Sequence, residues 1–154
     1  MRHSLDAIAR HGLAAVIAFS LAACAQMPAA KREAVQAAAQ WQSVAVTDNQ
    51  EAFVDTVSMT TVAGFVEART KQNFSQPQPS AKAGKAYRSA LNTYRFDCAQ
   101  RLLAMKELVA YEGPDLQGAV VQKATSTDRN LRWLDAPSST VFGEMLDFAC
   151  GRSR

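Results

Sequence analysis

The sequence predicts an α+β domain, in which an antiparallel β-sheet of about six strands carries a C-terminal α-helix on one face, linked by a disulfide. Three observations predict this fold. Short segments rich in β-branched and aromatic residues follow one another from Trp41 onward. After Trp133 the apolar residues recur at helical spacing instead. Two cysteines, Cys98 and Cys150, then remain as partners for a covalent link between sheet and helix.

Residues 1–23 have the layout of an export signal. Arg2 and Arg10 precede a charge-free apolar run over residues 12–23. That run has about a dozen residues, whereas a helix needs about 20 to cross a bilayer. We therefore expect residues 1–23 to be a signal peptide and not a permanent membrane span.

The apolar run ends in "LAAC", which resembles the lipobox of bacterial lipoproteins. That resemblance implies a diacylglycerol on the thiol of Cys24, cleavage before it and acylation of the new amino terminus. Several acyl chains together anchor a protein stably, whereas one holds it only marginally. Ala25 follows the cysteine where aspartate would retain the protein, so the resemblance favours the outer membrane. A plain secretory leader cut at an Ala-x-Ala site is the alternative.

Residues 24–40 are expected to be the lipidated cysteine and a tether, because this Ala- and Gln-rich stretch has no sustained apolar stripe. Loss of the leader removes two arginines and one aspartate, so the net charge falls from +3 to +2. Such a balance gives no reason to expect a nucleic-acid partner. The chain that remains is long enough for one domain, expected over residues 41–151.

The only two histidines, His3 and His11, both lie in the leader. The mature chain therefore lacks Ser-His-Asp and Cys-His nucleophile arrangements, histidine zinc sites and histidine general bases. No carboxylate pair stands out from ordinary surface charge. We expect a protein that is not an enzyme and that holds no metal or cofactor; an enzyme using carboxylates is the least favoured reading.

With Cys24 assigned to lipid, Cys98 and Cys150 are the remaining thiols of an exported chain. Disulfides form and persist in oxidising compartments, so we expect these two cysteines to be bonded to each other. The alternative is a pair of separate buried thiols.

Trp41–Thr47 and Glu51–Thr56 read as a β-hairpin, because both are rich in β-branched and aromatic residues and a polar turn separates them. Thr61–Thr70 reads as one longer strand. Ser75–Ala86 contains two prolines, a glycine and lysines, which predicts a mobile loop that cannot join the sheet.

Tyr87–Cys98 alternates at its end, which places Tyr94, Phe96 and Cys98 on one face, toward the core. Arg101–Glu112 has the composition of a helix, but its short link to the preceding strand favours a second strand. Ala119–Ser126 reads as a sixth strand after the turn at residues 113–118.

The C-terminal helix begins after Pro137 and a run of hydroxyl residues that suit an N-cap. Val141, Met145, Phe148 and Ala149 then repeat at helical spacing, and Gly151 provides the stop. This apolar stripe has to be buried, and the sheet face that carries Cys98 is available.

Several residues in this order resemble the surface-adhesin protein E family: "Y-x-F-D-C" at residues 94–98, "F-x-C" at residues 148–150, and Trp41, Tyr111 and Trp133. The resemblance covers about residues 41–150. It implies a small bacterial lipoprotein with an antiparallel sheet, a disulfide-tied C-terminal helix and binding of host matrix or plasma proteins. Ser138 departs from the family pattern, in which a glycine commonly precedes the helix.

The candidate binding loop is the basic stretch of Lys82, Lys85 and Arg88, with Lys71 nearby. Such a stretch suits acidic proteins, polysaccharide or anionic lipid headgroups, although an ordinary solvated loop explains it as well. Trp41 and Trp133 are expected to pack against the core.

These residues together predict a non-enzymatic outer-membrane lipoprotein with an adhesin-type binding domain. The expected partners are the membrane, through the lipid anchor, and a protein, with a homodimer left open. The alternative is a periplasm-facing envelope lipoprotein that supports a partner complex.

Overall fold

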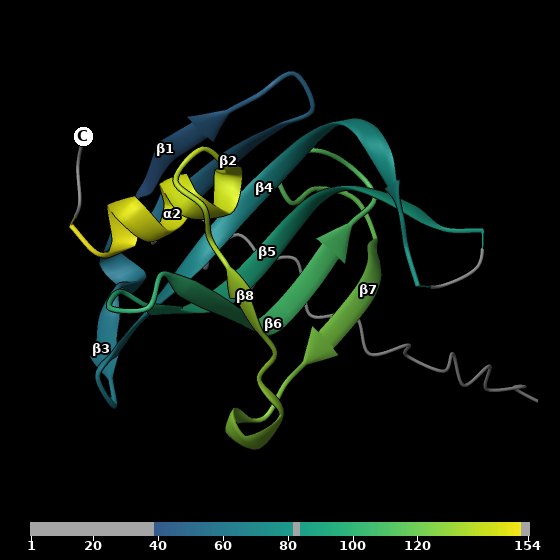
Figure 1. The fold of residues 1–154 in the computed structure, drawn as a ribbon. Helices are drawn as coiled ribbons and strands as arrows, with labels where there is room; N and C mark the ends of the chain where they lie inside the picture. Colours follow the sequence, from purple (N-terminus) through teal and green to yellow (C-terminus); the bar gives the residue numbers. More distant parts are fainter. Residues whose placement is uncertain (1–38, 82–83, 152–154) are drawn as a thin grey trace, which may run out of the picture.

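The computed structural model describes residues 39–81 and 84–151, and Figure 1 shows the fold. Lys82 and Cys24 therefore lie outside the described residues. The elements in chain order are β1 (Trp41–Val46), β2 (Gln50–Asp55), the 3-10 turn η1 (Thr56–Ser58), β3 (Thr60–Val62), β4 (Phe65–Pro79), β5 (Ala86–Asp97), β6 (Leu102–Tyr111), β7 (Val120–Thr125), the 3-10 turn η2 (Asp128–Asn130), β8 (Trp133–Asp135) and α2 (Val141–Ala149).

The sheet is antiparallel throughout, with strand order β1-β2-β4-β5-β6-β7. Two short strands extend it: β3 pairs with the start of β4, and β8 pairs with the start of β6. In Figure 1, α2 lies over the sheet on the side of β1 and β2. The predicted fold class is confirmed, but the described residues form eight strands and not six. The segment with helix-like composition is the strand β6, as predicted.

The prediction of a single strand over Thr61–Thr70 is wrong, because the chain reverses direction inside it. Ala63 and Gly64 have positive φ angles, 51° and 85°, and connect β3 to β4. Two-residue hairpin turns with φ > 0 at both positions match the twist of the strands that they join. The glycine was visible in the sequence as a turn signal, but the alternating apolar residues around it suggested an unbroken strand.

The predicted mobile loop at Ser75–Ala86 is also largely wrong, since β4 continues to Pro79 and β5 begins at Ala86. The pairing of β2 with β4 ends at Phe74 of β4. Beyond that residue β4 pairs with β5 alone. Proline is tolerated where one side of a strand has no neighbour, because no ladder hydrogen bond is lost there. The result is a two-stranded ribbon that extends past the body of the sheet.

The hydrophobic core lies between α2 and one face of the sheet. Tyr94 and Phe96 of β5 are buried in it, as predicted. The other buried core residues are Ala52, Val54, Ala68, Leu103, Ala136, Met145, Leu146 and Ala149. No helix of residues 39–81 and 84–151 has the length and apolar character that crossing a bilayer requires.

The C-terminal helix begins where the sequence predicts it. Thr140 is the N-cap, and its Oγ1 accepts a hydrogen bond from the amide of Gly143 at 3.0 Å. The helix ends at Ala149, and Cys150 is disulfide-bonded to Cys98 with Cα atoms 5.7 Å apart. The bond joins the end of the helix to the turn after β5, which confirms the predicted covalent link between the two layers.

Candidate functional site

The face of the sheet opposite α2 carries several ion pairs. Successive side chains of a strand point to opposite faces. On β4, Ala68 points into the core, so Glu67, Arg69 and Lys71 point to the other face. We call this the helix-free face.

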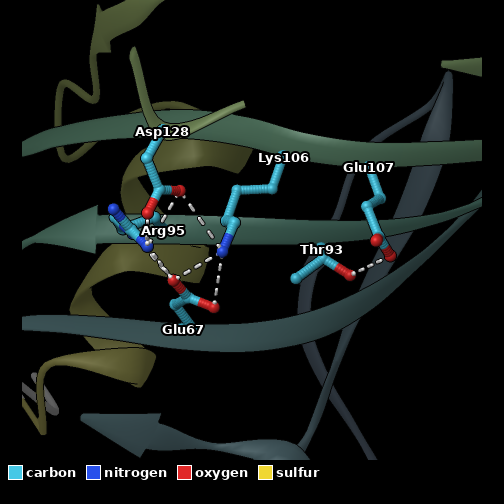
Figure 2. Close-up of polar contacts among 6 residues, drawn as sticks. All are labelled: Glu67, Thr93, Arg95, Lys106, Glu107 and Asp128. Carbon is cyan, nitrogen blue, oxygen red and sulfur yellow. Dashed lines mark hydrogen bonds and ion pairs between the residues drawn. The ribbon is translucent and has the colours of Figure 1, made fainter. Parts of the chain in front are cut away.

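Four charged residues form one cluster on this face, as Figure 2 shows. Arg95 Nε donates to Glu67 Oε1 at 2.7 Å, and a second guanidinium nitrogen of Arg95 also bonds that oxygen. Lys106 Nζ lies 3.0 and 3.2 Å from the two carboxylate oxygens of Glu67. Asp128 lies 3.3 Å from Arg95 and 3.6 Å from Lys106. We call Glu67, Arg95, Lys106 and Asp128 the charge cluster.

A β-bulge on β6 lies at Lys106 of the charge cluster. Thr93 of β5 pairs with Glu107, and the next residue, Tyr94, pairs with Met105. Lys106 is thus the extra residue on β6. It lies on the same face as Ala104, two residues before it, and the bulge brings Glu107 to that face as well. Met105 packs against the core on one side of the sheet, while Lys106 and Glu107 both reach partners on the other.

The charge cluster is held mostly out of water. The side chains of Arg95 and Glu67 are 7% and 15% exposed, whereas that of Asp128 is 64% exposed. Burial alone would raise the pKa of Glu67, but the hydrogen bonds and charges of Lys106 and Arg95 outweigh it and lower that pKa. Asp128 begins η2, so the cluster also attaches the connection between β7 and β8 to the sheet.

Aromatic side chains cover one side of the charge cluster. The rings of Phe65 and Trp133 have centroids 5.2 Å apart, and the guanidinium of Arg95 lies 5.7 Å from the Phe65 centroid. Trp133 is half-buried in this contact. Trp133 therefore packs on the helix-free face, so the expected packing of Trp133 against the core is wrong.

A second polar contact lies further along β4. Lys71 Nζ lies 2.9 Å from Asp115 Oδ1 and 4.3 Å from the Phe53 ring centroid. Asn73 Nδ2 donates to the same carboxylate oxygen at 2.7 Å. Hydrogen bonds from Lys71 and Asn73 lower the pKa of Asp115, although burial opposes the shift. The turn that carries Asp115 is thus attached to the sheet two strands away.

The predicted basic stretch does not gather into one patch over its described members. Lys71 lies on the helix-free face, held by Asp115. Arg88 lies on β5 at an even position, which points to the opposite face, and its side chain donates to the Ser75 carbonyl at 3.2 Å. Lys85 is exposed near the end of the ribbon. The binding role of Lys82, Lys85 and Arg88 stays a prediction.

Two contacts pair acidic with basic side chains on the helix-free face. No group of three or more His, Cys, Asp and Glu side chains within residues 39–81 and 84–151 could hold a metal ion. Glu67 and Asp115 are bonded to cations, which lowers the pKa of each carboxylate and keeps it ionised at neutral pH. Both contacts therefore fix the shape and the charge of the helix-free face.

The charge cluster could not be found from the sequence. Alternation from Ala104, which pairs with Arg95, places Lys106 on the helix-free face, whereas alternation from Leu108 places it on the core face, and the sequence does not show where the bulge separates the two patterns. The sequence indicates only weakly that Glu67 and Arg95 share a face, since both stand at polar positions of strands in which polar and apolar residues alternate.

A model of the surface-adhesin protein E family matches residues 41–151, more than half of the chain. The chain belongs to this family. The structure agrees with membership, since an antiparallel sheet with a disulfide-tied C-terminal helix is what the resemblance of the motifs implied. A comparison with curated proteins finds no match.

A solved structure of the family's namesake is similar in fold. The structure of protein E from Haemophilus influenzae has a TM-score of 0.50 and 15% sequence identity, over 72% of this chain and 83% of that chain. A crystal structure of protein E from non-typeable Haemophilus influenzae has a TM-score of 0.48 and 15% identity, over 71% of this chain and 75% of that chain. At such identity the first likeness shows a shared fold, and no more.

Proposed function

We propose that this protein is a non-enzymatic outer-membrane lipoprotein whose domain binds another macromolecule in the manner of an adhesin. The observation that carries this proposal is the match of residues 41–151 to the surface-adhesin protein E family. The "LAAC" sequence that ends at Cys24 supports the lipid anchor. The mature chain that would result has no histidine, which supports a role in binding and not in catalysis.

We place the binding surface at the end of the β4–β5 ribbon, where Lys85 is exposed. The ribbon extends beyond Phe74, the last residue of β4 that pairs with β2. The chain enters the domain at the other end of the sheet, since Gln40 bonds to Asp55 at the end of β2. An anchored domain can therefore present the ribbon away from its tether.

Solid-phase binding tests the adhesin role directly. The leaderless domain is applied to immobilised laminin, vitronectin and plasminogen, which sample host matrix and plasma proteins. We expect a saturable signal that weakens several-fold in Lys85→Glu, because exposed charges act mainly through steering and complementarity. Arg129→Glu in η2 is the matched control, since this arginine is exposed and lies outside the ribbon. The absence of any saturable signal at micromolar protein would remove the adhesin role.

The second candidate function is that of a periplasm-facing envelope lipoprotein that supports a partner complex. The same lipid anchor favours it, because an anchored domain can face either side of the outer membrane. Protease shaving of intact cells separates the two functions. A domain on the cell surface is cut, whereas a periplasmic domain survives until the outer membrane is opened.

A further inference from the structure

We propose that residues 56–66, here called the β3 hairpin, contact the surface of the lipid bilayer beside the anchor. This inference rests on the proposed lipid at Cys24. The β3 hairpin comprises η1, β3, the turn at Ala63 and Gly64, and the start of β4. In Figure 1 it projects from the sheet at the lower left.

The composition of the β3 hairpin suits a membrane interface. The sequence from Thr56 to Val66 is "TVSMTTVAGFV", without a charge, in a chain in which 20% of residues are charged. Val57 and Val62 are 53% and 41% exposed, and every residue of β3 is exposed. Exposed apolar side chains that project together with hydroxyl groups, and without charges, are favoured at the boundary between headgroups and acyl chains.

The β3 hairpin lies where the chain toward the anchor leaves the domain. The Gln40 amide donates to Asp55 Oδ1 at 2.9 Å, and the Gln40 carbonyl accepts from the Thr56 amide at 2.9 Å. Gln40 is therefore fixed at the base of the hairpin. The chain between Cys24 and Trp41 can span at most about 60 Å when fully extended. Such a tether keeps the hairpin at a high effective concentration near the bilayer, so a weak contact is enough.

The β3 hairpin is also held in one conformation. Thr60 pairs with Glu67 and Val62 with Phe65. At its base, Ser58 Oγ donates to the Asp55 carbonyl at 2.8 Å and accepts from the Arg69 amide at 2.9 Å. A preformed element loses little conformational entropy when it binds. The two valines are therefore already presented for insertion.

Lipid-dependent quenching tests this contact in the full, lipidated protein. A fluorescent amino acid is incorporated at Thr61, and the protein is reconstituted into phosphatidylethanolamine–phosphatidylglycerol vesicles that contain a nitroxide headgroup lipid. The matched control carries the same fluorophore at Val46, an exposed valine at the far end of β1. We expect quenching at position 61 to be at least threefold stronger than at position 46. Equal quenching at the two positions would overturn the inference.

A double variant, Val57→Asp with Val62→Asp, provides a second test of the membrane contact. Both valines are exposed, so the substitutions leave the fold intact, and unchanged thermal unfolding checks this. We expect the variant to remain with the vesicles but to lose most of the quenching at position 61. Quenching that persists in the variant contradicts a contact through these valines. If position 61 instead becomes buried without lipid, and more so at higher protein density, a second copy of the protein covers the hairpin. That result would contradict the inference.

Sedimentation with the vesicles separates this inference from the proposed anchor. Protein that pellets but shows no preferential quenching at position 61 keeps its anchor and contradicts the hairpin contact. Protein that does not pellet contradicts the anchor itself, and the inference fails with it.

Discussion

Lys106 reaches Glu67 across the intervening strand β5, because its side chain lies on the helix-free face, as does that of Ala104 two residues before it. Arg95 on β5 bonds the same carboxylate from its other side. Two cations thus share one acidic group that is 15% exposed. These side-chain contacts connect the neighbouring strands β4, β5 and β6 in addition to the backbone hydrogen bonds of the sheet.

Glu67→Gln should destabilise the domain by about 2 kcal/mol, because it removes the charge that two cations share while Arg95 stays buried. Asp128→Asn is the matched control in the same cluster. Asp128 is 64% exposed, so its loss should cost less than about 1 kcal/mol. Urea unfolding of both variants measures the difference, and equal losses would mean that burial does not govern the strength of these ion pairs.

Stability should fall on acidification below about pH 4.5, the ordinary pKa of Glu67. The folded state lowers the pKa of Glu67 and that of Asp115, so it holds these protons less tightly than the unfolded chain does. The resulting stabilisation is complete above the ordinary pKa values and is lost as the pH falls through the lowered ones. Urea midpoints between pH 7 and pH 3 test this, and Glu67→Gln should show a shallower decline over that range. An equal decline would exclude a contribution from Glu67.

Cys98→Ala and Cys150→Ala should lower stability by similar amounts, because the two sulfurs form one bond across a sequence separation of 52 residues. Closing a loop of this length in the unfolded chain is worth about 4 kcal/mol in the chain-entropy model. The double variant should lose little more than either single one. Thermal unfolding and thiol titration measure this, and strongly unequal single variants would contradict the pairing.

Gly143→Ala should destabilise the start of α2 by about 1–3 kcal/mol through overpacking. A Cβ on Gly143 would lie 2.0 Å from the carbonyl oxygen of Pro137, so the turn before the helix would have to move. Ser139→Ala, an exposed change in the same turn, should stay within about 0.5 kcal/mol of the original protein. A tolerated Gly143→Ala would mean that this turn is free to shift.

The parts of the fold that depend on local pattern could be predicted from the sequence. The hydroxyl run before Val141 and the stripe behind it predicted α2, and alternation predicted the buried Tyr94 and Phe96. Counting cysteines in an exported chain predicted the disulfide. Each of these signals lies within about ten residues or in composition, where sequence reasoning is strongest.

The missed parts depend on neighbours in space. Pro77 and Pro79 argued against a strand, yet the ribbon holds them because β2 has already ended. The bulge at Lys106 puts Glu107 on the helix-free face as well, which alternation alone cannot reveal. Neither the end of a partner strand nor a bulge has a reliable signature in one sequence.

The proposals for function and for membrane contact both depend on lipid at Cys24. Mass spectrometry of the amino-terminal peptide, from protein purified out of its own host, measures this most directly. We predict a chain that begins at Cys24 and carries a diacylglycerol thioether and an amide-linked acyl chain. An unmodified amino terminus, or a chain cleaved at another residue, would contradict both proposals.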